Sequence, residues 1–298
     1  MEASQKMKAL VLGGAGQLGR LLSDELSARE IDFVKHERNV GDLTSESFVR
    51  DYINSIGPTV VFNCSAWTDV DNAENEADKA FKVNRDSVAY IAKAAMANRS
   101  QFVHVSTDYV FSGESSTPWK VKDEKHPLSV YGKSKSAGED LALENYSEGT
   151  YIFRTAWLYS KYGRNFAKRI ISIAISGNED ISVVTDQQGQ PTSGKDLAER
   201  ILDTVIEGNN PGVYHATNSG ATTWYEFAEA ILELLGSDQT RLKKVTSSDL
   251  KLLAPRPKYS VLDHSEWSST TLPPMRSWRA ALSDDFLDIF EEVKKGIA

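Results

Sequence analysis

A tyrosine and a lysine spaced four residues apart are the side chains in this sequence best suited to catalysis. Tyr131 and Lys135 lie in the segment YGKSK. On a helix this spacing is just over one turn, so both side chains share one face. A free tyrosine has a pKa near ~10, and a neighbouring ammonium would stabilise its phenolate and lower that pKa. The spacing therefore predicts Tyr131 as a proton donor or acceptor and Lys135 as the group that tunes it.

A threonine upstream of this pair is expected where ligands bind. Thr107 follows the apolar run QFVHVS at 101–106, which is typical of a buried strand. In open α/β sheets, ligands bind beyond the carboxyl ends of the strands. The Thr107 hydroxyl could therefore donate a hydrogen bond to a carbonyl oxygen as negative charge develops on it. Capping of the strand or turn is the alternative role.

Three glycines near the start of the chain have the spacing of a phosphate-binding turn. Gly13, Gly16 and Gly19 separate the apolar run 7–12 from an amphipathic stretch at 18–29. Glycine lets the backbone turn tightly and approach a ligand, and the N-terminus of the following helix attracts a pyrophosphate. With a strand before it and a helix after it, the motif predicts dinucleotide binding. A purely structural turn is the alternative.

The end of the next expected strand bears on the choice of cofactor. An acidic residue there holds the ribose 2′-hydroxyl of NAD, whereas an arginine accommodates the 2′-phosphate of NADP. The sequence has Lys35, His36, Glu37 and Arg38 in succession, so both kinds of residue are present. The three basic residues favour NADPH, with NADH also accepted.

The elements that must position these residues alternate between strand and helix. Apolar runs at 7–12, 31–34, 59–64, 101–106 and 151–155 are separated by amphipathic stretches, including 77–97 and 134–145. This alternation predicts an α/β fold with a Rossmann-type, doubly wound parallel sheet. We expect residues 1–160 to bind NAD(P). Residues 161–298 should form mainly a smaller, partly irregular substrate-binding lobe, with segments near 178–217 returning to the sheet.

Composition excludes several classes of protein. The formal net charge of −8 argues against a nucleic-acid partner, which usually needs a basic face. No stretch approaches the ~20 apolar residues that a membrane span requires, and the N-terminal segment lacks the pattern of a signal peptide. The single cysteine, Cys64, fits a reducing compartment. We therefore expect a cytoplasmic protein without a membrane partner.

Longer motifs resemble one family. The segments NCSAWTDVDNAE at 63–74, STDYVFSG at 106–113, PLSVYGKSKSAGE at 127–139, FRTAWLYS at 153–160 and DQQGQPTSG at 186–194 are similar to the dTDP-4-dehydrorhamnose reductase family. The matches run nearly from end to end, and those in the second half separate this family from short-chain dehydrogenases at large.

The resemblance implies a reaction and a set of site residues. NAD(P)H would reduce the C4 keto group of a nucleotide-linked 4-keto-6-deoxysugar, most simply dTDP-4-dehydro-L-rhamnose to dTDP-L-rhamnose. Tyr131 would protonate the alkoxide, Lys135 would bind the nicotinamide ribose, and Thr107 would polarise the carbonyl. Expected cofactor contacts are Gly13, Gly16, Gln17, Leu18, Gly19, Arg38, Asp42, Leu43, Ser65, Ala66, Trp67, Tyr131 and Lys135. Expected substrate contacts are Thr107, Asp108, Trp157, Asn165 and Arg256.

Two departures from the family pattern affect these expectations. Members that form a metal-bridged dimer carry glutamates where this chain has Leu21 and Lys195, so we expect no metal and a monomer or weak homodimer. Trp67 stands where many members have histidine, which would reshape the pocket beside the nicotinamide.

Three other functions fit the same scaffold. A sugar-nucleotide dehydratase is disfavoured because Tyr109 occupies the position of its catalytic glutamate. A sugar-nucleotide epimerase would hold its NAD permanently. A regulatory subunit resembling the β subunit of methionine adenosyltransferase is disfavoured by Thr107 and Trp157, because that relative has serine at the first position and lacks the tryptophan.

Overall fold

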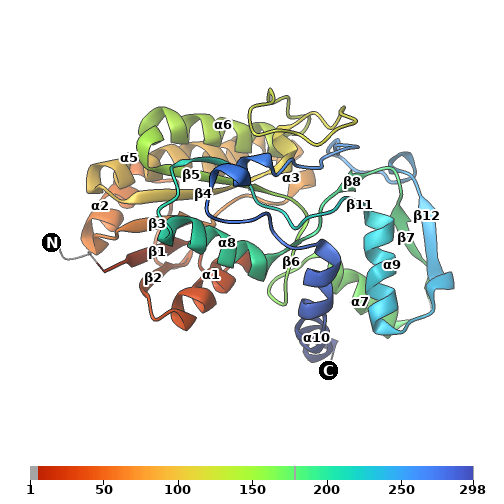
Figure 1. The fold of residues 1–298 in the computed structure, drawn as a ribbon. Coiled ribbons are helices and arrows are strands. Elements are labelled where there is room, and N and C mark those ends of the chain that lie inside the picture. The colour runs from red at the N-terminus through yellow and green to blue at the C-terminus, as the bar shows by residue number, and fades with distance from the viewer. Residues whose placement is uncertain (1–5, 178, 298) are drawn as a thin grey trace.

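The computed structural model describes residues 6–177 and 179–297, and a six-stranded parallel sheet forms its centre (Figure 1). Its strand order is β10-β5-β4-β3-β1-β2, with every pairing parallel. The strands are β1 (Lys8–Leu12), β2 (Asp32–His36), β3 (Val60–Asn63), β4 (Gln101–Thr107), β5 (Thr150–Thr155) and β10 (Gly212–His215). The predicted α/β class and doubly wound sheet are confirmed.

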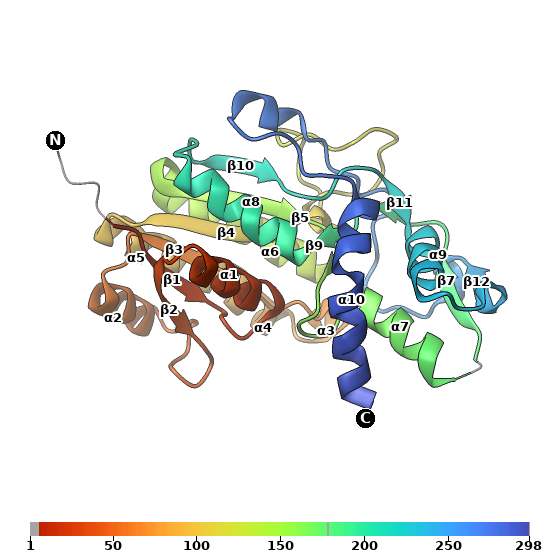
Figure 2. The same ribbon diagram turned by 60° about the horizontal axis from the view of Figure 1, so that its bottom comes forward.

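Helices cover both faces of this sheet, as the continuous apolar strands require. On one face, Ala9 and Val11 of β1 pack in a cluster with α1 (Gln17–Ala28) and α8 (Gly194–Ile206), which lie side by side in Figure 2. Leu10 and Leu12 point to the opposite face, because successive side chains of a strand alternate. The helices on that face are α2 (Glu46–Ile56), α5 (Ser87–Asn98) and α6 (Val130–Tyr146).

The helix expected over 77–97 contains an irregular turn. The structure has α4 (Ala77–Phe81), then a π-helical turn over Lys82–Asp86, then α5; the short helix α3 (Val70–Asn75) precedes them. A π-helical turn widens the helix by one residue and often occurs at functional sites. Here it contains Asn84, which is 1% exposed.

The second half of the chain forms a lobe around its own apolar cluster, beside one end of the sheet (Figure 1). Its helices are α7 (Phe166–Ser176), α9 (Trp224–Leu235) and α10 (Trp278–Ile297). Three two-stranded sheets accompany them: β6 (Leu158–Tyr159) with β9 (Thr192–Ser193), β7 (Ile181–Val184) with β12 (Leu242–Val245), and β8 (Gln188–Gly189) with β11 (Thr222–Thr223). Within the segment 178–217, β10 joins the main sheet, whereas β7 belongs to the lobe.

Across the described ranges 6–177 and 179–297, the helices are all too short or too polar to cross a membrane.

A buried ion pair fixes α6, the helix that carries Tyr131 and Lys135. The side chain of Glu139 is 1% exposed and receives two hydrogen bonds from Arg154 of β5, Nε to Oε1 at 2.9 Å and Nη2 to Oε2 at 2.7 Å. Lys125 adds a third contact at 3.3 Å. Burial alone would raise the pKa of the Glu139 carboxyl, but Arg154 and Lys125 outweigh it and lower that pKa. The bidentate geometry holds α6 against β5.

Replacing Glu139 with glutamine should destabilise the protein strongly. Arg154 would remain a buried cation without its partner, which costs about 3–5 kcal/mol. The matched change Asp140→Asn removes a 65%-exposed carboxylate that also contacts Lys125, and should cost less than ~1 kcal/mol. Urea denaturation measures the change in unfolding free energy for both variants, and equal changes would contradict the stabilising role of the Glu139–Arg154 pair.

The contribution of the Glu139 carboxylate to stability should depend on pH. Because its folded pKa is depressed, this contribution is present above the unfolded pKa and is lost as pH falls through the folded pKa. Glu139→Gln should therefore lose less stability on acidification than the wild type.

Candidate active site

The glycine turn lies between β1 and α1, and two of its glycines are required by packing. A Cβ on Gly13, whose φ is +76°, would lie 2.7 Å from the backbone nitrogen of Ser65. A Cβ on Gly19 would lie 2.3 Å from the carbonyl oxygen of Gly13. Gly16, the N-cap of α1, is different, because its Cβ would meet only the Gly13 oxygen at 3.3 Å. Glycine at this position leaves the start of α1 open to a ligand.

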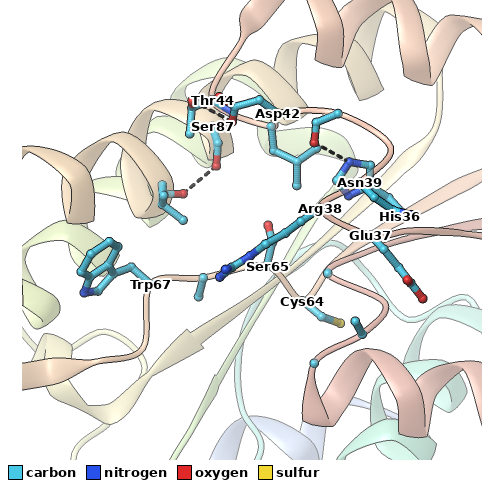
Figure 3. Close-up of a pocket in the computed structure, with 17 residues that line it drawn as sticks. His36, Glu37, Arg38, Asn39, Asp42, Thr44, Cys64, Ser65, Trp67 and Ser87 are labelled. Carbon is cyan, nitrogen blue, oxygen red and sulfur yellow. Dashed lines mark hydrogen bonds between the residues drawn. The ribbon is translucent and has the colours of Figure 1, made fainter.

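A cavity of about 870 Å³ opens beside this turn (Figure 3). It lies along the carboxyl ends of β1, β2 and β3, where ligands bind in sheets of this type. Most of the expected cofactor contacts line it, namely Gly13, Gly16, Arg38, Asp42, Leu43, Ser65, Ala66 and Trp67. Gly19, Gln17, Leu18, Tyr131 and Lys135 lie outside its lining.

Gln17 and Leu18 can meet a cofactor only through their backbone. The Leu18 side chain is 5% exposed and packs in the core. The Gln17 side chain is directed to the segment before α7, where its Oε1 accepts hydrogen bonds from Ser160 at 3.0 Å and Asn165 at 3.1 Å. The free N–H groups at the start of a helix remain the parts of these residues suited to a phosphate.

At the β2 end of the cavity, a loop held by internal hydrogen bonds lies beside the exposed side chain of Arg38. His36 is buried and its Nε2 lies 3.1 Å from the carbonyl oxygen of Gly41. Asp42 accepts hydrogen bonds from the backbone and hydroxyl of Thr44, which lower its carboxyl pKa. The exposed Arg38 side chain extends across the cavity towards Ser65, whereas Glu37, which also lines the cavity, points in another direction (Figure 3).

Asn84 connects the cavity to α6, although no motif in the sequence predicts a role for it. Its Oδ1 accepts from the Trp67 backbone nitrogen at 2.8 Å, and its Nδ2 donates to the Trp67 carbonyl oxygen and to Ser134 Oγ, each at 3.0 Å. One buried amide thus joins the loop after β3 to the helix of Tyr131 and Lys135. An asparagine inside a long helical stretch, where it is disfavoured, was the available signal.

Tyr131 and Thr107 lie near each other at the carboxyl end of β4. Thr107 is the last residue of that strand, and its hydroxyl lies close enough to the Tyr131 phenol to affect the pKa of that phenol. Burial raises the pKa of Tyr131 to about 12, and the charge of Asp108 adds to this, whereas the Thr107 hydrogen bond opposes it. The spacing led us to expect a lowered pKa. The structure differs because the Lys135 amine is directed to the Val105 carbonyl oxygen at 2.6 Å and to His104 at 3.2 Å. Tyr131 is therefore a protonated phenol, the form that donates.

Asp108 is buried beside these groups. Its Oδ1 accepts a hydrogen bond from the Thr107 hydroxyl at 3.0 Å, and its side chain is 2% exposed. Burial raises its carboxyl pKa to about 6, against the opposing hydrogen bonds of Ser260 and Thr107. An acid beside a tyrosine and a threonine at this strand end is suited to a polar substrate.

The remaining expected substrate residues lie in different surroundings. Trp157 has φ +45° and stacks on Trp224, with ring centroids 3.7 Å apart. Asn165 uses its amide hydrogens on Gln17 and on the Ser160 carbonyl oxygen, while its Oδ1 caps α7 by accepting from the backbone nitrogen of Lys168. These contacts give Asn165 a structural role, and its contact with the substrate stays a prediction.

Arg256 is already paired in the structure. Its Nη2 lies 2.8 Å from Asp71 Oδ2, and its Nη1 donates to the carbonyl oxygen of Ala254 at 3.1 Å. Asp71, in α3, also accepts from the backbone nitrogens of Leu253 and Ala254. A diphosphate bound by Arg256 would have to share it with Asp71.

Leu21 and Lys195, which stand where metal-bridged members of the family carry glutamates, line the same small surface cavity. Asp285 and Asp288 also line it. Within 6–177 and 179–297 there is no group of three or more His, Cys, Asp or Glu side chains placed to hold a metal ion. That no metal bridges two copies of the chain stays a prediction.

Known proteins of similar sequence cover both lobes. The model of the RmlD substrate binding domain family matches residues 7–291. The chain belongs to this family. It is 41% identical over 281 residues to a dTDP-4-dehydrorhamnose reductase of Streptomyces griseus, covering 93% of this chain and 92% of that one.

Solved structures agree with the family assignment. A dTDP-4-dehydrorhamnose reductase from Bacillus anthracis, in complex with NADP, superposes with a TM-score of 0.90 at 34% identity, covering 95% of this chain and 100% of that one. A dTDP-4-dehydrorhamnose reductase from Clostridium acetobutylicum superposes with a TM-score of 0.91 at 37% identity. The match covers 96% of this chain and 100% of that one. The family fold therefore extends through the glycine turn, α6 and the lobe.

Exchanging Gly16 for alanine should separate ligand binding from folding. The new methyl group would stand at the open N-terminus of α1, so we expect NADPH to bind at least about ten-fold more weakly, or ~1.4 kcal/mol. Thermal stability should change little, whereas Gly13→Ala should lower it markedly because its Cβ collides with the Ser65 backbone. Fluorescence titration with NADPH and thermal melts test this pair. Folded Gly16→Ala protein that binds NADPH as tightly as the wild type would refute the placement of the phosphate.

Proposed function

We propose that this protein uses NADPH to reduce the C4 keto group of dTDP-4-dehydro-L-rhamnose, giving dTDP-L-rhamnose. The observation that carries the proposal is the proximity of the Tyr131 and Thr107 hydroxyl groups at the carboxyl end of β4, in a chain 41% identical to a dTDP-4-dehydrorhamnose reductase. Two hydroxyl groups near one strand end can both reach the oxygen of a carbonyl undergoing reduction.

The protein groups have distinct tasks in this reaction. NADPH, when bound, supplies the hydride that reaches the carbonyl carbon. Tyr131 holds its proton firmly, since burial raises its pKa to about 12, and gives that proton to the alkoxide oxygen. Thr107 lies near the phenol and would orient the same oxygen. Lys135, one turn along α6, would hold the nicotinamide ribose.

The cavity fits the cofactor. Gly13 and Gly16 would give the pyrophosphate access to α1, Asp42 and Leu43 would lie near the adenine, and Ser65, Ala66 and Trp67 line the cavity after β3. Arg38 crosses the cavity where the ribose 2′-phosphate would lie (Figure 3), which favours NADPH; we propose that NADH is also accepted. The Bacillus anthracis relative was solved with NADP.

Substrate recognition would fall mainly to residues 161–298, where Arg256 is the candidate for the diphosphate, shared with Asp71. Asp108 and Trp157, from the first 160 residues, would contact the sugar. We propose the corresponding division into residues 1–160 for the cofactor and 161–298 mainly for the substrate, with β10 completing the sheet. A cytoplasmic monomer or weak homodimer is part of the same proposal.

Removing the Tyr131 hydroxyl tests the reaction. With enzymatically prepared dTDP-4-dehydro-L-rhamnose, the wild type should oxidise NADPH and form dTDP-L-rhamnose, and Tyr131→Phe should lower kcat by roughly 10²–10⁴-fold. Tyr109, whose ring lies 5.7 Å from that of Tyr131, provides the matched control, because Tyr109→Phe should change kcat less than about ten-fold. NADPH absorbance and product chromatography are the measurements. Wild-type protein that binds NADPH but leaves this substrate unreduced would refute the proposal.

Removing the Arg38 charge tests the choice of cofactor. Hydrogen bonds to charged groups contribute about 1.5–3 kcal/mol, so Arg38→Ala should raise the KM for NADPH by roughly 10–100-fold and leave the KM for NADH nearly unchanged. Lys35→Ala is the control, because the Lys35 stem lies against Gly14 outside the cavity lining. Equal changes for NADPH and NADH would show that Arg38 does not contact the 2′-phosphate.

A further inference from the structure

Three buried side chains form a hydrogen-bonded row beneath the cofactor cavity. Asn63 ends β3, His104 lies directly opposite it on β4, and Lys135 reaches them from α6. They are 1%, 0% and 2% exposed. Asn63 Nδ2 lies 3.2 Å from His104 Nδ1, and His104 Nε2 lies 3.2 Å from Lys135 Nζ. The row therefore ends at the lysine of the proposed site.

The backbone fixes the direction of donation along this row. The N–H of Ser65 donates to Asn63 Oδ1 at 3.1 Å. A backbone N–H only donates, so the atom facing it must be the oxygen of the Asn63 amide. The amide nitrogen, which also only donates, then faces His104 Nδ1. His104 Nδ1 must accept, and the proton of the neutral imidazole lies on Nε2.

That tautomer directs an N–H at the lysine. An ammonium has no lone pair, so it cannot accept a hydrogen bond from the His104 Nε2–H, and two donor groups would face each other. A neutral amine has a lone pair and accepts that hydrogen bond. Lys135 Nζ also donates to the Val105 carbonyl oxygen at 2.6 Å. A neutral amine satisfies both contacts and retains one N–H for a ligand. Protonation of His104 would not relieve the conflict, because the imidazolium donates from both nitrogens.

The charges around Lys135 are consistent with this arrangement. Burial lowers the pKa of Lys135 to about 8, against an opposing effect of Glu139 on the same helix. Glu139 is already bound by Arg154 and Lys125. Cys64, beyond the end of β3, is a neutral thiol because burial raises its pKa to about 12. Burial and Lys135 together lower the pKa of His104 well below its usual range.

We infer that Asn63 and His104 are positioning residues that present an N–H to Lys135 and weaken its hold on a proton, so that Lys135 exchanges a proton in the working pH range and is not a permanent cation. The inference deepens the proposed function, because it assigns the control of a residue in that site. It also accounts for Tyr131 keeping a high pKa beside a lysine that is turned away from it.

The tautomer can be read directly in the protein without substrate. The chain has five histidines, so ¹⁵N-histidine labelling gives an assignable spectrum. We expect His104 protonated on Nε2. His215 is an internal control with the opposite form, because its Nδ1 faces the Asp263 carbonyl oxygen at 3.0 Å and must donate. A pH titration of the His104 signal should report the ionisation of Lys135, and Lys135→Met should abolish that titration.

Reversing the direction of hydrogen-bond donation through His104 tests how the row controls the proton affinity of Lys135. In Asn63→Asp the carboxylate still accepts from Ser65 and now also accepts from His104 Nδ1–H, which moves the ring proton off Nε2. His104 Nε2 would then accept from an ammonium, so the proton affinity of Lys135 should rise at least about ten-fold. The His215 signals should not change.

Two results would overturn the inference: His104 protonated on Nδ1 in the wild type, or an unchanged Lys135 titration in Asn63→Asp after the tautomer has switched. If Asn63→Asp fails to fold, the wild-type tautomer and the Lys135→Met titration decide the matter. These readouts need neither substrate nor turnover. A protein with the expected tautomer that reduces no dTDP-linked keto-sugar would refute the proposed function and leave this inference intact.

Discussion

The contact between the backbones of Gly13 and Ser65 is the constraint on which the rest of the site depends. There is no room between them for a Cβ, so the turns after β1 and β3 close against each other and form the floor of the cavity. Ser65 faces the cavity and also donates its backbone N–H to Asn63. The cofactor path and the hydrogen-bonded row to Lys135 therefore share one fixed point in the sheet.

Two further buried groups transmit that fixed geometry to α6. Asn84 ties the backbone of Trp67 to Ser134, and Glu139 ties the same helix to Arg154 of β5. Lys135 lies between these two contacts along α6, and Tyr131 lies three residues before Ser134. A polar group buried this deeply is tolerated only when its hydrogen bonds are satisfied. Each of these two contacts therefore holds α6 in one position. The lobe is joined to the first half of the chain by other hydrogen bonds, including those from Arg256 to Asp71 and from Asn165 to Gln17.

Local patterns in the sequence were sufficient to predict the sheet and the glycine turn, because apolar runs and glycine spacing report directly on local structure. Cavity residues such as Ser65 and Trp67 could be named only from the resemblance to the family. The surroundings of Lys135 could not, because His104 and Asn63 meet it only through strand register and helix packing. The same limit applied to Asn165: a motif match gave its position, whereas only the fold revealed that it caps α7.

The strand order has a consequence for the order in which the protein can be made. β5, whose six residues are all buried, pairs with β10 on its outer side, and β10 ends at His215. A ribosome that has released only the first 160 residues has therefore produced a sheet with an open, apolar edge, which is a template for aggregation. The nucleotide-binding half cannot mature before much of the second half has emerged. A gene fragment cut at the apparent boundary near residue 160 would encode an unfinished sheet, and any excised version must carry β10 with it.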